Sequence, residues 1–294
     1  MWHRPVLRRR TIITMSDTTI ALKSGEPDEY LFRTGDAELA RLGYQHRAWG
    51  AQTYAIWERA GFAPGWRILD LGSGPGYCTI DLAHLVGPSG GVVAVDASER
   101  FLSHIQKRLT VEPVNNVQTI ECDVNELDLP AGSLDGAYAR WLLCFLPDPL
   151  NVVKRVASAL RPGGVFAIQD YSNYRAVDVL PKSEAFRRGI EAIRASWEAH
   201  GGDQDIASRL PELLVQAGFD VREAKPLVRT GRPGTSLWGW PDIFFRLHIP
   251  AMVETGYLSE ADGAAFMAEW DERGKDPNAV LLTPPMMDVI AVKR

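Results

Sequence analysis

Residues 68–76 read Ile-Leu-Asp-Leu-Gly-Ser-Gly-Pro-Gly, a short apolar strand that runs directly into a glycine-rich turn. The spacing of these glycines distinguishes two classes of cofactor site. A dinucleotide-binding turn follows the pattern G-x-G-x-x-G, in which the third glycine permits close packing of helix on strand. Here Tyr77 stands where that third glycine would fall, after Gly72, Gly74 and Gly76. The turn still brings bare backbone to a ligand, because glycine adopts positive φ and has no Cβ.

The sequence around this turn alternates between strand and helix patterns. Apolar runs typical of strands alternate with segments of helical periodicity, and glycine and proline separate them. This alternation indicates βαβ units, and hence an α/β fold whose parallel sheet carries helices on both faces. We expect strands at residues 67–71, 92–95, 117–122, 134–139, 165–169, 221–227 and 287–292, and helices at 36–59, 78–86, 101–109, 150–160, 183–200 and 206–217.

The composition is that of an ordinary globular protein of 294 residues, with 46% hydrophobic and 23% charged residues. A net charge of −5 argues against nucleic acid as a partner, and no apolar run approaches the roughly 20 residues of a membrane span. Cys78, Cys122 and Cys144 are too few for a disulfide framework, and we expect small buried side chains in a cytoplasmic protein. The arginine-rich start lacks a signal-peptide apolar run, so residues 1–28 are expected to be a disordered leader, with Met15 as an alternative start.

Two acidic residues follow the next two expected strands. Asp96 ends the second strand, about 20 residues beyond the glycine turn, where a carboxylate can accept both hydroxyls of an adenosine ribose. Asp123 follows the third strand, where it either accepts a hydrogen bond from an adenine amine or only caps a turn. The carboxyl ends of neighbouring parallel strands meet at one edge of a sheet. The glycine turn, Asp96 and Asp123 are therefore expected to form a single site.

The order of these features resembles the motifs of class I S-adenosylmethionine-dependent methyltransferases. The stretch Leu160-Arg-Pro-Gly-Gly164 before the fifth strand adds to the match, and the resemblance covers residues 64–170. Within that class the chain is similar to the bacterial small-molecule group, the type 11 or UbiE-like methyltransferases. The resemblance implies a Rossmann-like seven-stranded sheet with an antiparallel last strand, a helical leader and lid, and S-adenosylmethionine as the cofactor.

The resemblance also implies which residues bind the cofactor. Asp96 holds the ribose and Asp123 the adenine, Asp70 and the glycine turn line the methionine portion, and Ala139 and Arg140 lie next to the sulfonium. The full expected set is Tyr30, Gln45, Asp70, Gly72, Ser73, Gly74, Gly76, Asp96, Ala97, Asp123, Val124, Ala139 and Arg140.

Two members of this set have competing interpretations. An arginine beside a cationic sulfonium departs from the small polar residue or histidine of many family members, so Arg140 is expected to reach the methionine carboxylate or to pair with Asp170 or Asp148. Tyr30 and Gln45 lie in a leader similar to those of bacterial small-molecule methyltransferases. They either contact the methionine end of the cofactor or only pack a helix.

The residues that perform catalysis are less visible. Methyl transfer mainly requires orientation and exclusion of water, and a hydroxyl acceptor gains from a general base. The candidate bases are His46, Tyr171, His200 and His248. Tyr171, Trp238 and Phe245 are candidate acceptor contacts, although the aromatic residues of that region also suit helix packing. We expect no metal, because the fourth strand ends in Ala139-Arg140, where a metal site of the catechol type would need carboxylates.

The expected organisation is a leader at 1–28, a helical cap at 29–62, a cofactor-binding core at 63–170, and a remainder at 171–294 with acceptor-binding helical insertions at 171–204 and 230–277. The sequence predicts methyl transfer to N or O of a small, apolar or aromatic molecule, without nucleic acid or membrane as partner, by a monomer or homodimer. The alternatives are an NAD(P)-dependent oxidoreductase, a non-catalytic S-adenosylmethionine-binding protein, and a carbon-methylating quinone enzyme.

Overall fold

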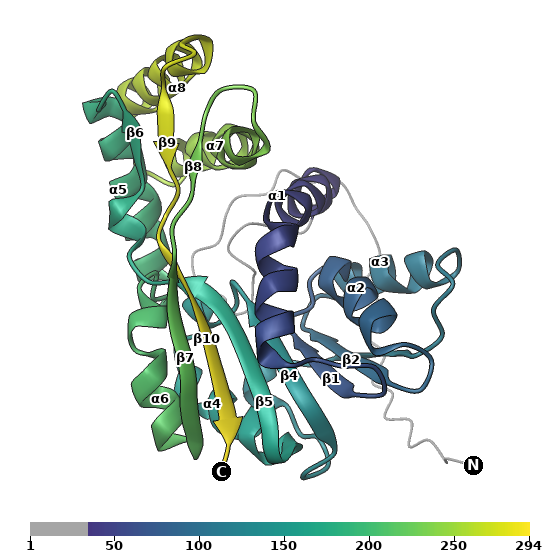
Figure 1. Ribbon diagram of the computed structural model, residues 1–294. Helices are drawn as coiled ribbons and strands as arrows, with labels where there is room; N and C mark the ends of the chain where they lie inside the picture. Colours follow the sequence, from purple (N-terminus) through teal and green to yellow (C-terminus); the bar gives the residue numbers. More distant parts are fainter. Residues whose placement is uncertain (1–34) are drawn as a thin grey trace, which may run out of the picture.

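A seven-stranded sheet forms the centre of the computed structural model, which describes residues 35–294 (Figure 1). The strand order is β3-β2-β1-β4-β5-β10-β7, and β10 runs antiparallel to both of its neighbours. The fold class predicted from the sequence, including the antiparallel last strand, is confirmed. The strands are β1 (Arg67–Leu71), β2 (Gly91–Asp96), β3 (Val117–Glu121), β4 (Leu134–Arg140), β5 (Leu160–Tyr171), β7 (Phe219–Leu227) and β10 (Met286–Lys293).

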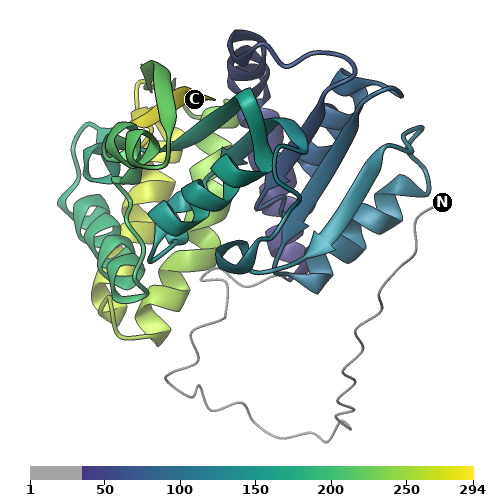
Figure 2. The ribbon, with the colours of Figure 1, turned by 90° about the horizontal axis from the view of Figure 1, so that it is seen from below.

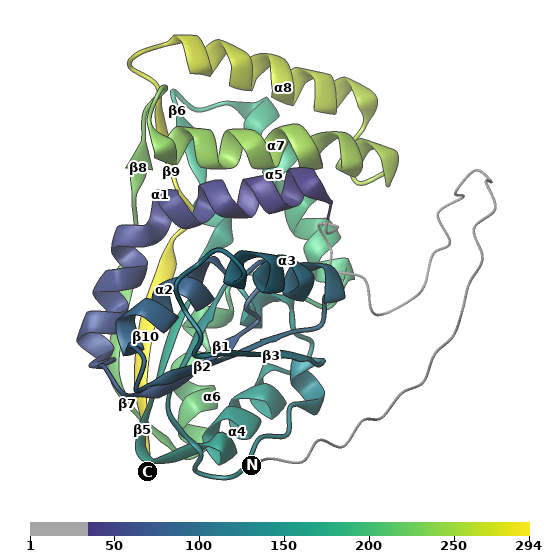
Figure 3. The ribbon, with the colours of Figure 1, turned by 90° about the vertical axis from the view of Figure 1, so that its right-hand side faces the viewer.

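Helices cover both faces of this sheet. Helices α1 (Asp36–Ala60), α2 (Tyr77–Val86) and α3 (Glu99–Leu109) lie on one face, and α4 (Pro149–Ala159) and α6 (Leu210–Gln216) lie on the other (Figure 3). Buried apolar side chains fill both interfaces, which is the arrangement that βαβ units require. Seen from below, the early part of the chain lies on one side of the molecule and the late part on the other (Figure 2).

A second body, which we call the lid, stands above the carboxyl ends of the parallel strands. It contains α5 (Glu184–Ala199), α7 (Ser236–Glu254) and α8 (Glu260–Lys275) (Figures 1 and 3). A small sheet of β6 (Asp178–Leu180), β9 (Val280–Leu282) and β8 (Thr230–Gly231) joins it to the core, and we call this sheet the neck. The neck was not predicted, because strands of two or three residues are too short to show periodicity.

Helix α1 connects the two bodies. It packs against β5 of the core and against α7 of the lid (Figure 3). Trp57, on the core side, is 1% exposed and meets the ring of Tyr138 edge-on. Trp49, near the middle of the helix, is equally buried and meets Trp240 of the lid edge-on. Aromatic pairs of this kind add to the free energy of burial, so α1 fixes the lid relative to the sheet.

Element boundaries differ from the sequence prediction at a few places. Helix α1 begins at residue 36, as predicted, with Gly35 as its N-cap, and it ends one residue later than predicted, at Ala60. The segment expected as one helix from 206 to 217 divides into a 3-10 turn at Ile206–Ser208 and α6. Pro211 has no N–H and therefore suits the first turn of a new helix.

Candidate functional site

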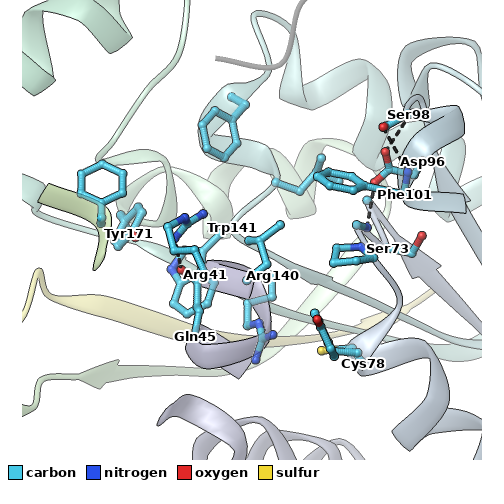
Figure 4. Close-up of a pocket in the computed structure, with 18 of the residues that line it drawn as sticks. Arg41, Gln45, Ser73, Cys78, Asp96, Ser98, Phe101, Arg140, Trp141 and Tyr171 are labelled. Atoms are coloured by element: carbon cyan, nitrogen blue, oxygen red, sulfur yellow. Dashed lines mark hydrogen bonds between the residues drawn. The ribbon is translucent and has the colours of Figure 1, made fainter. Parts of the chain in front are cut away.

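A cavity of about 490 Å³ lies between the carboxyl ends of the parallel strands and the lid. Its walls come from the loops after β1, β2 and β3, from the ends of β4 and β5, and from α1, α5 and α7. Figure 4 shows Asp96 and Ser73 at one end of this cavity and Tyr171 at the other. We call these the glycine-loop end and the lid end.

The glycines of the turn after β1 have different roles. All of them have positive φ, at +66° for Gly72, +53° for Gly74 and +81° for Gly76. A Cβ at Gly76 would lie 2.3 Å from the side chain of Ile105, so this residue lets α2 approach α3 and does not line the cavity. A Cβ at Gly74 would meet nothing within 4 Å, although Gly74 lines the cavity. The space beside Gly74 is therefore open to a ligand.

Asp96 holds the glycine loop from the end of β2. Its carboxylate accepts one hydrogen bond from the N–H of Gly74 at 2.8 Å and another from the N–H of Ser98 at 2.9 Å. Burial raises the pKa of Asp96, and these two hydrogen bonds oppose the increase. Each carboxylate oxygen has a second lone pair, which is enough to accept two ribose hydroxyls. Ala97 follows Asp96 along the cavity wall.

Asp123 lines the same end of the cavity and also caps a turn. One of its oxygens accepts the N–H of Asn125 at 2.8 Å, at the start of the 3-10 turn Val124–Glu126. The turn cap is thus observed, and the hydrogen bond to an adenine amine stays a prediction. Val124, which is 6% exposed, adds an apolar contact beside it.

Two further polar side chains, those of Asp70 and Ser73, face this end of the cavity. Asp70 is 3% exposed and accepts a hydrogen bond from the hydroxyl of Thr79 at 2.6 Å, and burial raises its pKa to about 6. Ser73 also lines the cavity, and its buried hydroxyl has no hydrogen-bond partner among residues 35–294. Buried polar groups are normally satisfied, so an unpartnered hydroxyl here suits a bound ligand.

Arg140 lies at the end of β4, on the cavity floor. Its guanidinium donates to the hydroxyl of Thr53 at 2.6 Å and lies 3.4 Å from Nδ1 of His46. It makes no salt bridge in the described part of the chain, and the expected pairs do not form, since Asp170 accepts backbone N–H groups and Asp148 caps α4. A partly buried cation without a carboxylate partner favours an anion in the cavity.

His46 belongs to the support of Arg140. Its Nε2 lies 2.8 Å from the carboxylate of Asp81, and its Nδ1 faces Arg140. An Nε2–H tautomer that donates to Asp81 and accepts from Arg140 satisfies both contacts. His46 does not line the cavity, and neither does Ala139, which is buried in β4.

None of the other predicted bases, His200, His248 and Tyr171, is suited to accept a proton in the cavity. His200 is exposed at the end of α5, where Nδ1 lies 2.6 Å from the carbonyl of Ser196. His248 is buried in α7 beside Phe244, and burial lowers its pKa to about 3. Tyr171 does line the cavity, but burial raises the pKa of its hydroxyl well above the usual value. Tyr171 therefore stays protonated at neutral pH.

Aromatic side chains line the lid end. The rings of Trp141 and Trp240 stack 5.9 Å apart with a 19° angle between their planes, and Tyr171 lies 6.1 Å from Trp141. Trp141 has φ of +49°, a left-handed conformation that is uncommon for a bulky residue and is found at functional sites. The other aromatic lining residues of this end are Phe145, Tyr174, Trp197, Phe244 and Phe245.

The two predicted acceptor contacts on α7 separate in the structure. Phe245 lines the cavity, whereas Trp238 does not. Trp238 stacks on Trp270 of α8, with ring centroids 4.4 Å apart, and so packs the lid. Trp240 takes the position at the cavity, because two residues along a helix rotate a side chain by about 200°.

The structure also adds residues that the sequence analysis missed. Arg41 of α1 lines the cavity with its guanidinium on the carboxylate of Glu38, at 2.6 Å and 2.7 Å. Gln45, one turn along, lines the cavity as well. Tyr30 and the leader at 1–28 lie outside the described residues. Among the cysteines, Cys122 is only half-buried, contrary to expectation, whereas Cys78 and Cys144 are buried.

No helix within residues 35–294 is long and apolar enough to cross a membrane. No group of three or more His, Cys, Asp and Glu side chains in this range is placed to hold a metal ion.

Comparison with known proteins identifies the central region. Residues 68–164, which run from the glycine loop to the Gly-Gly turn of β5, match the family described as "Methyltransferase domain". These residues are therefore similar to a methyltransferase domain. The recognition made from the sequence is thus confirmed, and so is S-adenosylmethionine as the cofactor of this class.

Named relatives of the chain include a demethylmenaquinone methyltransferase from Lactococcus lactis, 37% identical over 41% of this chain and 46% of the relative. A ubiquinone/menaquinone biosynthesis C-methyltransferase from Pseudomonas fluorescens is 28% identical over 60% and 73%. The chain thus spans about half the length of the first of these relatives. A crystal structure assigned as a methyltransferase, from Bacillus halodurans, shares the fold at a TM-score of 0.58, with 18% identity over 82% of this chain and 97% of the other.

The residues at the glycine-loop end fit S-adenosylmethionine. The fit rests on the open space at Gly74, the available lone pairs of Asp96, and two groups without a counterpart in residues 35–294, the hydroxyl of Ser73 and the charge of Arg140. These groups match in kind the ribose hydroxyls and the methionine carboxylate that such a ligand presents.

Proposed function

We propose that this methyltransferase transfers a methyl group from S-adenosylmethionine to a small aromatic acceptor. The observation that carries the proposal is that one continuous cavity contains both kinds of wall. Carboxylates and bare glycine backbone line one end, and stacked aromatic rings line the other. A planar apolar molecule at the lid end would then lie directly against the methionine end of the cofactor.

Each cofactor contact is proposed from its position in the cavity. The carboxylate of Asp96 would accept the ribose hydroxyls, and the free oxygen of Asp123 would accept the adenine amine. The N–H groups and open space of the glycine loop would surround the methionine chain, with Asp70 beneath it. Arg140 would bind the methionine carboxylate, because its guanidinium lacks an acidic partner in the described residues.

Catalysis is proposed to depend on orientation. The cofactor supplies a methyl group on a cationic sulfur with a good leaving group, so the transfer is an in-line displacement. The stacked rings of Trp141 and Trp240 would fix the plane of the acceptor, and the lid would keep water out. No histidine of residues 35–294 lines the cavity, and Tyr171 stays protonated, so the proposal assigns no general base.

The atom that receives the methyl group separates two versions of the proposal. The sequence analysis favoured N or O. The names of the two relatives bring in carbon, since one is a C-methyltransferase of quinone biosynthesis and the other acts on demethylmenaquinone by name. Carbon methylation of an aromatic ring is therefore kept as the second candidate, and the aromatic cavity suits both.

Ligand-dependent thermal stability tests the proposal. A ligand that binds only the native state raises the unfolding midpoint, so S-adenosylhomocysteine should raise it while NAD and NADP should not. Transfer of label from methyl-labelled S-adenosylmethionine to a panel of phenols, quinols and aromatic amines then identifies the acceptor. A rise with NAD alone would overturn the cofactor assignment. Strong binding of S-adenosylhomocysteine to a protein that excludes every aromatic probe would instead favour a non-catalytic binding protein.

A further inference from the structure

A cluster of polar side chains from α1 interrupts the aromatic walls of the lid end. Arg41 and Gln45 both line the cavity and are 4% and 8% exposed. Figure 4 places them beside Trp141, on the side of the cavity away from Asp96. Two buried polar residues in an otherwise aromatic chamber are more than packing requires, because polar side chains are costly to bury.

The hydrogen bonds of Gln45 fix the direction in which its amide points. Its oxygen accepts from Nη1 of Arg41 at 2.9 Å and from the indole N–H of Trp240 at 2.8 Å. Both partners are donors only, so the oxygen must face them and the NH₂ group must face away. This NH₂ group has no partner among residues 35–294. The assignment of the amide therefore follows from the contacts, and a donor remains for a ligand.

The neighbouring tyrosine hydroxyls can also donate, although a hydroxyl accepts hydrogen bonds too. Tyr171 and Tyr174 line the same end, and burial raises the pKa of both hydroxyls, so both carry their proton at neutral pH. Arg41 forms a bidentate ion pair with Glu38, so its charge is neutralised within this cluster. Asp96 lies at the opposite end of the cavity (Figure 4), and Asp123 follows β3, the strand next to β2. The lid end thus offers hydrogen-bond donors within aromatic walls.

We propose that Gln45, held by Arg41 and Trp240, is a specificity-determining residue that donates to an oxygen atom of the acceptor. The ligand class is an oxygenated aromatic, bearing a ring carbonyl, phenolate or carboxylate. An aromatic ammonium would place a donor against the NH₂ group of Gln45. This inference rests on the proposed function for its meaning as an acceptor site, and it reassigns Gln45 from the methionine end of the cofactor to the acceptor.

Binding of naphthalene derivatives tests the inference without knowledge of the natural acceptor. The probes are 2-naphthol, 2-naphthoate, 2-naphthylmethylammonium and naphthalene, titrated against the intrinsic tryptophan fluorescence with and without S-adenosylhomocysteine. The wild-type protein should bind 2-naphthol or 2-naphthoate at least tenfold more tightly than naphthalene, and the ammonium probe more weakly than either. Equal affinities for the oxygenated probes and naphthalene would overturn the inference.

Gln45→Glu is the decisive variant. It is isosteric, and one of its oxygens still accepts from Arg41 and Trp240, but its second oxygen replaces the NH₂ donor. The preference for oxygenated probes should disappear or reverse, while the affinity for S-adenosylhomocysteine stays within threefold of wild type. Gln118→Glu is the matched control, since it makes the same change on the exposed surface of β3. An unaltered preference in Gln45→Glu contradicts the proposal.

A second variant covers the case in which Gln45→Glu does not fold. Trp240→Phe keeps an aromatic ring in the wall but removes one of the two donors that fix the amide of Gln45. The amide then has less reason to point its NH₂ group into the cavity, and the preference should fall by two- to fivefold. A preference equal to wild type counts against the role of the pair. Loss of S-adenosylhomocysteine binding with an intact probe preference would refute the proposed function and leave the donor site standing.

Discussion

Replacement of Arg140 by methionine should have opposite consequences for the empty protein and for its affinity for the cofactor. In the absence of ligand the guanidinium is partly buried with two hydrogen bonds, to Thr53 and His46, and without a carboxylate partner in residues 35–294. A partly buried charge carries a desolvation penalty of a few kcal/mol, whereas two lost hydrogen bonds cost about 1 kcal/mol each. The free energy of unfolding of Arg140→Met should therefore equal or exceed that of the wild type, by up to about 2 kcal/mol.

The affinity for S-adenosylhomocysteine should fall in the same variant. Removal of one partner of a buried charge pair costs about 2–5 kcal/mol, which corresponds to a rise in Kd of roughly 30-fold to several thousand-fold. Methylthioadenosine has the same adenosine and sulfur but no amino-acid end, so its Kd should change by less than threefold. Isothermal titration calorimetry with both ligands separates the two effects.

The ratio of the two affinities is the critical readout. A distorted cavity would weaken both ligands together, whereas loss of a carboxylate contact weakens only the one that carries a carboxylate. If Arg140→Met reduced both affinities equally, or left the Kd of S-adenosylhomocysteine within threefold, the assignment of Arg140 would be wrong. Asp81→Asn, which weakens the support of His46 at a distance from the cavity, should give a smaller change in the same ratio.

Three further predictions follow from the same cavity and its lid. Gly74→Ala and Gly61→Ala should each lose about 1 kcal/mol of unfolding free energy, because both glycines have positive φ and open space around the added Cβ. Only Gly74→Ala should also raise the Kd of S-adenosylhomocysteine, by tenfold or more in calorimetry. The folded-state pKa of Asp70 is about 6 against an ordinary value of 3.8, so the native protein holds this proton more tightly and loses roughly 3 kcal/mol of stability as the pH rises from about 4 to 6. Asp70→Asn should remove that loss, and urea unfolding curves of variant and wild type that shift in parallel with pH would contradict it. Trp238→Leu should lower the thermal midpoint through loss of its stack on Trp270 without altering the binding of aromatic probes, and a changed probe affinity would place Trp238 in the acceptor site.

The cofactor end could be predicted from sequence because its determinants are local. A strand, a glycine turn and an acid at the end of the next strand occupy short segments, and parallel pairing brings them to one edge. The position of Asp96 relative to Gly74 follows from that register alone. The assignments of individual contacts there remain predictions that the ligand-binding experiments above can test.

The lid end could not be predicted in the same way. Trp238 and Trp240 are both large aromatics on one helix, and which of them faces the cavity depends on how α7 docks against α8 and α1. His46 is a candidate base in the sequence because histidine often serves as one. In the structure its ring is held by Asp81, which lies 35 residues away in the sequence and gives no local signal. Arg41 carried no local signal, since an Arg three residues after a Glu is typical of any exposed helix.

The neck has a consequence for how acceptor specificity can be exchanged between enzymes. The chain enters the lid after β5, leaves it, and enters again after β7, so two separate stretches of sequence build one body. Strand β9 from the second stretch pairs with β6 from the first, and a Cβ on Gly189 of α5 would lie 2.2 Å from Phe266 of α8. A chimera that replaced only one stretch would pair β6 with a foreign β9, or α5 with a foreign α8, and these contacts would not fit. Recombination of this specificity therefore needs both stretches together, residues 172–204 and 228–285, on an unchanged core.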